Sequence, residues 1–130
     1  MSAAILFLAS CQSMHNNKVS EDFDKGTRNY IRMVRWNELD QAPLTFVDDT
    51  LRAEFEKRVK AAKDVKISDY REKYTECKPE KGEGELLVEW DYYIPPSIRL
   101  KTVVDSQKWR YVEEEERKGW MLMTLFPEFK

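Results

Sequence analysis

The chain has 130 residues, with 22 Lys and Arg residues against 24 Asp and Glu residues and a formal net charge of −2. This length fits one folded domain, and a hydrophobic content of 42% supplies enough apolar side chains for a core. The balanced charge lacks the positive excess that nucleic-acid binding needs, and no segment reaches the roughly 18 apolar residues of a membrane-spanning helix. We therefore expect a single soluble domain with no nucleic-acid partner.

Residues 1–10 carry no charged side chain and precede Cys11. Their apolar run at 3–9 is at the short end of the h-region of a secretory signal. The tetrapeptide Leu8-Ala9-Ser10-Cys11 resembles the bacterial lipobox, in which the Cys thiol is acylated before the bond preceding it is cleaved. The resemblance implies a lipoprotein signal peptide at 1–10 and a lipid such as palmitate on Cys11. Gln12, in place of the Asp that retains lipoproteins at the inner membrane, favours the cell outer membrane, facing the periplasm.

Residues 12–18 form a short polar segment without periodicity, which predicts that the lipidated Cys11 and the residues after it, 11–19, are a flexible tether of at most about 25 Å. A signal of this kind normally begins with a basic residue, and this one begins Met1-Ser2-Ala3. Two alternatives therefore stay open: a start assigned too late, or an ordinary apolar N-terminus. If Cys11 carries no lipid, a disulfide with Cys77 is conceivable; otherwise Cys77 is a structural thiol.

Two helices are predicted at the start of the folded domain, which spans 20–130. Ser20 is a candidate N-cap followed by acidic residues, and apolar or small side chains then recur every three or four positions to about residue 40. This first stripe consists of Phe23, Thr27, Tyr30, Ile31, Val34 and Asn37. Asp48 and Asp49 are candidate caps of a second helix, whose stripe consists of Leu51, Phe55, Val59 and Ala62.

From Val65 the apolar period changes to two, which predicts antiparallel strands. The first runs to residue 77 with a bulge, and the second ends at Pro95-Pro96. Alternation resumes from 98 to 113 and, after a turn at 117–119, from 120 to 126. One face of the second strand carries Leu86, Val88, Trp90, Tyr92 and Ile94, and the core face of the last two carries Trp109, Tyr111, Leu122, Thr124 and Phe126.

Two helices followed by long antiparallel strands predict an α+β fold, with N-terminal helices packed on a curved, twisted sheet. Over residues 20–129, this element order resembles the NTF2-like superfamily. The pattern Asp105-Ser-Gln107-Lys-Trp109-Arg-Tyr111, followed by Gly119-Trp120-Met-Leu122, is similar to the last strands of small NTF2-like lipoproteins of Gram-negative bacteria. The resemblance implies a cystatin-like cone. Related folds serve as isomerases, dehydratases, transport factors and scaffolds, so the fold does not select a function.

The candidate site residues form two groups. Six aromatic side chains could line a small apolar ligand pocket inside the cone, with core packing as the alternative. They are Tyr30, Trp90, Tyr92, Trp109, Tyr111 and Trp120. Six apolar side chains are expected on the outer face of the sheet, as the interface of a homodimer or of an envelope protein partner. They are Leu87, Val103, Val112, Met121, Met123 and Leu125.

Several catalytic chemistries lack the residues they need. The single His, His15, lies in the expected tether, and two Cys with one His cannot form a four-ligand zinc site. No metal or other cofactor is expected. Asp91 is the nearest candidate for a pocket carboxylate, but alternation places it opposite Trp90 and Tyr92. The sequence favours a membrane-anchored, non-catalytic lipoprotein that binds a partner or small ligand; the alternatives are a small isomerase- or dehydratase-type enzyme and a cytosolic NTF2-like scaffold.

Overall fold

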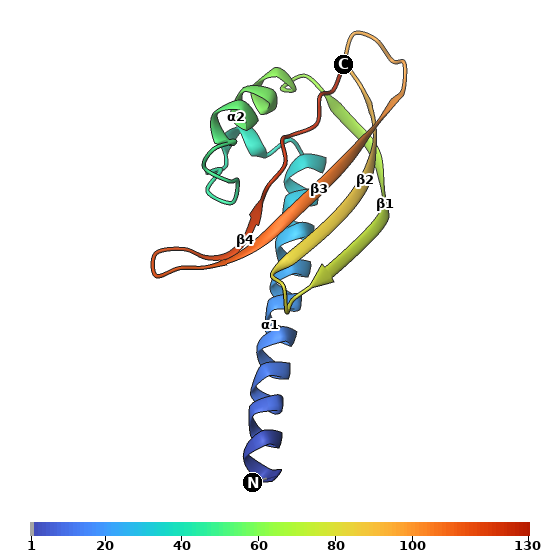
Figure 1. Cartoon of the computed structure of the whole chain (residues 1–130). Helices are drawn as coiled ribbons and strands as arrows, with labels where there is room; N and C mark the ends of the chain where they lie inside the picture. Colours follow the sequence, from blue (N-terminus) through green and yellow to red (C-terminus); the bar gives the residue numbers. More distant parts are fainter. Residues whose placement is uncertain (1) are drawn as a thin grey trace.

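The computed structural model contains two α-helices, a short 3-10 helix and one sheet (Figure 1). It describes residues 2–130, and the side chains from residue 12 onward. The helices are α1 (Ser2–Arg35), η1 (Leu39–Gln41) and α2 (Arg52–Ala61); the strands are β1 (Lys66–Lys78), β2 (Glu83–Tyr93), β3 (Lys101–Glu113) and β4 (Lys118–Leu122). The predicted signal peptide and Cys11, the predicted lipidation site, lie outside the described side chains.

The four strands form an open antiparallel sheet in the order β1-β2-β3-β4, so each strand pairs with its neighbour in sequence. The pairing of β1 with β2 shifts register between Ile67 and Asp69 and again between Glu72 and Tyr74, which confirms the predicted bulge. The long helix α1 runs behind the curved strands, and α2 lies beside the chain that follows β4 (Figure 1). The predicted α+β fold, with helices packed on an antiparallel sheet, is confirmed.

The stripe of α1 that faces the sheet begins one turn earlier than the sequence predicts. Val19 is buried four positions before Phe23, and its carbonyl oxygen accepts a hydrogen bond of 2.9 Å from Trp120 Nε1. The helix also includes residues 12–19, so the prediction of an irregular tether there is wrong. Helical hydrogen bonding thus extends back from the anchored Val19, although the side chains of residues 12–18 are mostly exposed.

Asn37 ends α1 and does not belong to its apolar stripe, which corrects the predicted stripe and its end near residue 40. Its φ of 55° is in the left-handed region, which Asn tolerates better than most residues at a helix C-terminus. The backbone N–H of Glu38 closes the end by donating to the carbonyl of Met33 at 2.8 Å. The Asn37 side chain donates to the carbonyl of Lys63 at 3.0 Å, which ties the end of α1 to the end of α2.

The predicted capping of α2 by Asp48 and Asp49 is wrong. Leu51 occupies the N-cap position, and no side chain donates or accepts a capping hydrogen bond there. The Asp49 carboxylate instead accepts hydrogen bonds from Arg117 at 3.1 Å and from Arg52 at 2.5 Å. These two guanidinium groups hold the pKa of Asp49 below its ordinary value. Asp49 therefore joins the start of α2 to the β3–β4 hairpin.

The inward faces of the strands follow the predicted alternation in β2 and differ at the ends of β3 and β4. Buried inward side chains of β2 are Leu86, Val88, Trp90 and Tyr92. β3 begins at Lys101, not at 98, because the chain after Pro95-Pro96 forms a loop. β4 ends at Leu122, not at 126, because Leu122 also pairs with Val47 in a parallel bridge that draws the chain toward α2. Trp109 pairs with Leu122, as their predicted shared core face requires.

Candidate functional site

The six aromatic candidates for a pocket lining lie in the core. Five are buried and Tyr111 is half-buried against them. The ring centroids of Tyr30 and Trp109 are 5.7 Å apart, and those of Tyr111 and Trp120 are 5.5 Å apart. None of four hollows lined by the described residues brings two of these six side chains together. Their rings pack on one another, which is the core-packing alternative.

A chain of hydrogen bonds between polar side chains runs through this core. Asp105 is only 3% exposed. Its Oδ2 accepts hydrogen bonds from Gln107 Nε2 at 2.8 Å and from Trp90 Nε1 at 3.2 Å. Gln107 Oε1 in turn accepts from Trp109 Nε1 at 3.0 Å. Burial raises the pKa of Asp105 to about 6, although the bonds from Gln107 and Trp90 act in the opposite direction.

Tyr30 of α1 faces the same buried region. Its hydroxyl is buried without a hydrogen-bond partner among the described residues. Burial, and then the nearby charge of Asp105, raises the pKa of Tyr30 well above its ordinary value. Asp105 and Gln107 are not among the site residues predicted from the sequence. Their positions did offer a signal: Gln107 and Asp105 come two and four residues before Trp109 on the same strand. Residues at even spacing on a strand share one face, so this spacing places both on the core face of Trp109.

Asp91 lies on the outer face of the sheet, opposite Trp90 and Tyr92 as predicted. Arg71 donates to both of its carboxylate oxygens, at 2.7 and 2.9 Å, and Thr102 Oγ1 donates to Oδ1 at 2.6 Å. These donors hold the pKa of Asp91 well below its ordinary range. Asp91 is thus an ion-paired surface carboxylate, and Asp105 is the carboxylate enclosed by aromatic rings.

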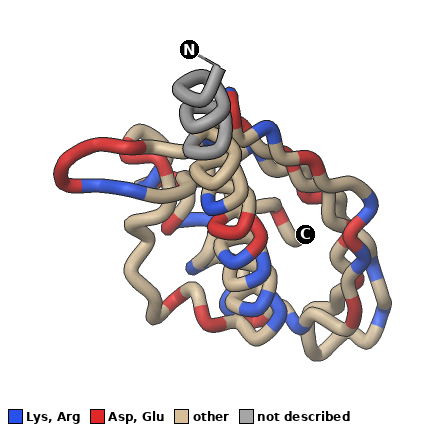
Figure 2. The backbone as a smooth tube through the Cα atoms, turned by 90° about the horizontal axis from the view of Figure 1, so that it is seen from below, with Lys and Arg blue, Asp and Glu red and all other residues tan. Residues whose placement is uncertain are grey.

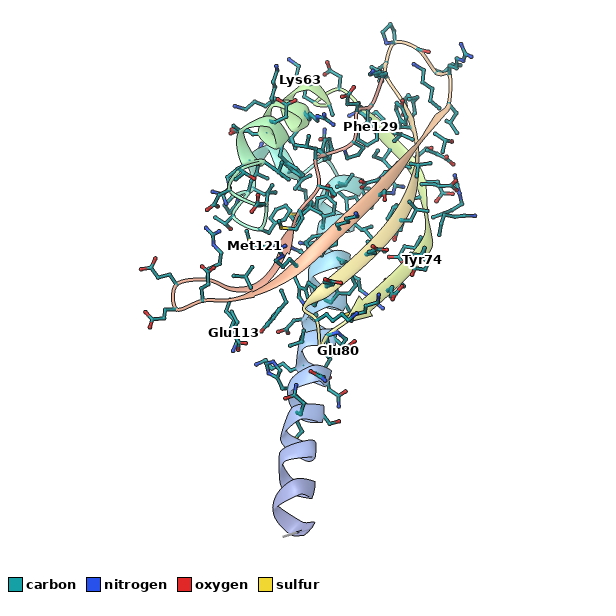
Figure 3. The ribbon with its side chains drawn as sticks, in the orientation of Figure 1. Lys63, Tyr74, Glu80, Glu113, Met121 and Phe129 are labelled. Carbon is teal, nitrogen blue, oxygen red and sulfur yellow. The ribbon has the colours of Figure 1, made fainter. Side chains whose placement is uncertain are left out.

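The six candidate interface residues do not form one exposed apolar patch. Val103 pairs with Trp90 and therefore faces inward, where it is half-buried against the core. Leu125 also packs against the core, and Met121 of β4 is buried (Figure 3). The remaining three, Leu87, Val112 and Met123, are half-buried. The expectation of an exposed patch is wrong for these reasons, and a homodimer or partner interface at these residues stays a prediction.

The feature that the sequence analysis missed is a groove of about 650 Å³ between α1 and β1. Its apolar lining includes the buried side chains of Phe23, Ile31 and Leu86. Two aromatic side chains are exposed along it: Trp36, at the end of α1, is 64% exposed and Tyr70 of β1 is 38% exposed. The groove therefore combines a buried apolar floor with accessible aromatic rings.

Three arginines of α1 also line this groove, and their hydrogen bonds differ. Arg28 forms an ion pair with Asp24 at 3.1 Å. Arg35 donates to the carbonyls of Ile67 and Ser68, and its guanidinium carbon lies 4.8 Å from the centre of the Trp36 ring.

Arg32 donates to Asn29 Oδ1 at 2.6 Å and forms no ion pair with any acidic side chain that the structure describes. From residue 25 to the end of α1 its charged residues are all basic, and they are the blue segments of that helix in Figure 2. Arg32 is consequently the groove's most available guanidinium.

Comparison with models of protein families, with curated proteins and with solved structures finds no match for this chain. Within the described part of the chain, no helix is both long enough and apolar enough to cross a membrane. The same residues hold no group of three or more His, Cys, Asp or Glu side chains placed to bind a metal ion. The groove and the polar cluster of the core are therefore the two candidate sites of this protein.

Proposed function

We propose that this protein is a non-catalytic binding protein with an NTF2-like domain, anchored to the bacterial outer membrane by a lipid on Cys11. Its binding surface is the groove between α1 and β1. The observation that carries the proposal is Trp36, which is 64% exposed at a groove floored by buried Phe23 and Ile31. Aromatic side chains left in water beside apolar surface are typical of interaction sites.

The position of Asp105 supports binding over catalysis. A general acid or base must come within hydrogen-bond reach of its substrate, and Asp105 is enclosed by core side chains that already donate to it. The second candidate, an isomerase- or dehydratase-type enzyme, has one observation in its favour: a pKa of about 6 suits proton transfer near neutral pH. That enzyme would need its core to open around Asp105, whereas the groove is open already.

The helix that includes residues 12–18 sets the distance between a lipid on Cys11 and the folded domain. At about 1.5 Å per helical residue, the exposed residues 12–18 span about 10 Å. This is less than half of the extended tether that the sequence analysis expects. A lipid on Cys11 would thus hold the folded domain close to the membrane surface.

Replacing Cys11 with Ala tests the anchor and separates the proposal from a cytosolic scaffold. In the native host, the unaltered protein is expected in the membrane fraction with an acylated N-terminal Cys11, measured by mass spectrometry. Cys11→Ala is expected to leave that fraction, because acyl chains contribute about 0.8 kcal/mol per buried CH₂ to membrane binding. Cys77→Ala, the matched control at the half-buried second thiol, should stay membrane-bound. Unchanged fractionation of Cys11→Ala, or an intact Met1, would contradict the anchor.

Photo-crosslinking tests the groove. A photoreactive residue is placed at Trp36 in the host, and a second at Ser106, an exposed position on the outer face of β3. A specific adduct is expected from position 36 and not from position 106, because only the first lines the groove. Mass spectrometry of the purified protein identifies the adduct as a protein or a small molecule. Equal labelling at the two positions, or none at either, would exclude the groove as the binding surface.

A further inference from the structure

We infer that the α1–β1 groove binds a single-chain amphiphile with an anionic head group, such as a fatty acid. The inference rests on the proposed function and narrows the ligand of the same groove. Three features of the groove carry it: an available cation, apolar side chains along its length, and three satisfied backbone groups at the start of the neighbouring strand β1.

The cation is Arg32. A guanidinium offers five N–H donors, and among the side chains that the structure describes only Asn29 accepts from Arg32. Three arginines line the groove against two acidic residues, Asp24 and Glu72, so its charge favours an anion. A carboxylate or phosphate head can accept two parallel hydrogen bonds from one guanidinium. Arg28, one turn away, pairs with Asp24 and leaves Arg32 as the primary head-group ligand.

The groove has the length of an extended chain, and apolar side chains occur along it between polar and charged ones. The lining residues run from Phe23 of α1 to Trp36, which directly follows the helix, about 20 Å at 1.5 Å per residue. The volume of about 650 Å³ is in the range of small-molecule sites. Ile31 and Leu86 are buried along the floor, and Tyr70 and Trp36 provide exposed ring faces. An acyl chain can lie along this surface with its head group at Arg32.

The edge of β1 argues against a peptide in the same place. A peptide that adds to a sheet edge needs free backbone N–H and C=O groups on that edge. Arg35 already donates to the carbonyls of Ile67 and Ser68, and the Asp69 carboxylate accepts from the Tyr70 backbone N–H at 2.8 Å. An acyl chain needs no backbone partner, so these satisfied groups favour it.

The test uses the full chain carrying Cys11→Ser, so that no attached acyl chain competes for the groove. Decanoate and decyltrimethylammonium, which share chain length and differ in head-group charge, are titrated by calorimetry. Decanoate is expected to bind at least about tenfold more tightly, the change that one charge-assisted hydrogen bond provides. Arg32→Gln should weaken decanoate by about the same factor, and Trp36→Ser should weaken both probes. Lys25→Gln, an exposed α1 position outside the groove, should leave both affinities unchanged.

The outcomes separate this inference from the proposed function. Equal affinity for the two probes, or unchanged decanoate binding by Arg32→Gln, overturns the anionic amphiphile. Absence of decanoate binding together with a protein adduct from position 36 overturns it too, and leaves the groove as a protein-binding surface. Absence of both binding and any adduct overturns both proposals. Far-ultraviolet circular dichroism checks that each variant is folded. Arg32→Gln is expected to fold because, among the described side chains, Arg32 bonds only to the exposed Asn29.

Discussion

Gly84→Ala is expected to destabilise the domain by about 1–3 kcal/mol, the usual effect of overpacking a filled core. Gly84 of β2 faces α1, and a Cβ atom there would lie 2.2 Å from Cε1 of Phe23. The Phe23 ring is buried, with its centroid 4.8 Å from that of Trp120, so it cannot turn away without moving a second ring. Urea unfolding followed by circular dichroism measures the loss.

Gly26→Ala is the matched control. A Cβ at Gly26 would meet nothing within 4 Å, and Ala is the better helix former, so this variant should gain up to about 1 kcal/mol. Phe23→Leu removes the ring that clashes with the added Cβ. The double variant Phe23→Leu, Gly84→Ala should therefore lose less stability than the two single variants lose in total. A Gly84→Ala variant as stable as the unaltered protein would show that α1 can move away from β2 at little cost.

This contact illustrates what the sequence could predict of the fold. The stripe of Phe23, Tyr30 and Ile31, and the alternation of β2, are local patterns, and both were predicted correctly because each marks one buried face. Gly84, by contrast, has no side chain to contribute to the alternation of β2. Its close approach to Phe23 depends on how α1 crosses the sheet, which no local period encodes.

The groove could not be predicted for a similar reason. Arg32 comes from α1, Trp36 from the turn that follows it, and Tyr70 from β1, so only the packed structure brings them together. One signal was available: Trp36 is a large aromatic residue out of phase with the apolar stripe of its helix. The alternation predicted from residue 98 was a misleading signal, because its apolar residues Ile98, Leu100 and Val104 are exposed. Asp105 faces inward instead, because it pairs with the buried Val88 of β2.

Asp105→Asn is expected to stabilise the domain near neutral pH and to flatten its pH dependence. Burial raises the pKa of Asp105 from an ordinary value near 3.8 to about 6. Between these values the folded state binds more protons than the unfolded state, so the free energy of unfolding falls as pH rises. This rise in the pKa corresponds to about 3 kcal/mol in the free energy of unfolding. That stabilisation is present below about pH 4 and lost above about pH 6.

The measurement is a series of urea unfolding curves from about pH 4 to about pH 7.5, the range that brackets the shifted pKa of Asp105. Asp105→Asn removes the charge and keeps an oxygen that can accept hydrogen bonds from Trp90 and Gln107. The free energy of unfolding of this variant should therefore exceed that of the unaltered protein only at the upper end of the pH range. The added amide N–H groups offset part of the gain, because they too need partners in the core.

Asp91→Asn provides the control with the opposite sign. Arg71 and then Thr102 lower the pKa of Asp91, so its ionised form stabilises the fold above the ordinary carboxyl range and loses that effect as pH falls. Asp91→Asn should therefore be less stable than the unaltered protein near neutral pH and indistinguishable from it in acid. If Asp105→Asn behaved in the same way, the hydrogen bonds that Asp105 accepts from Trp90 and Gln107 would outweigh the penalty of burying its charge, and the core carboxylate would be ionised in the folded protein.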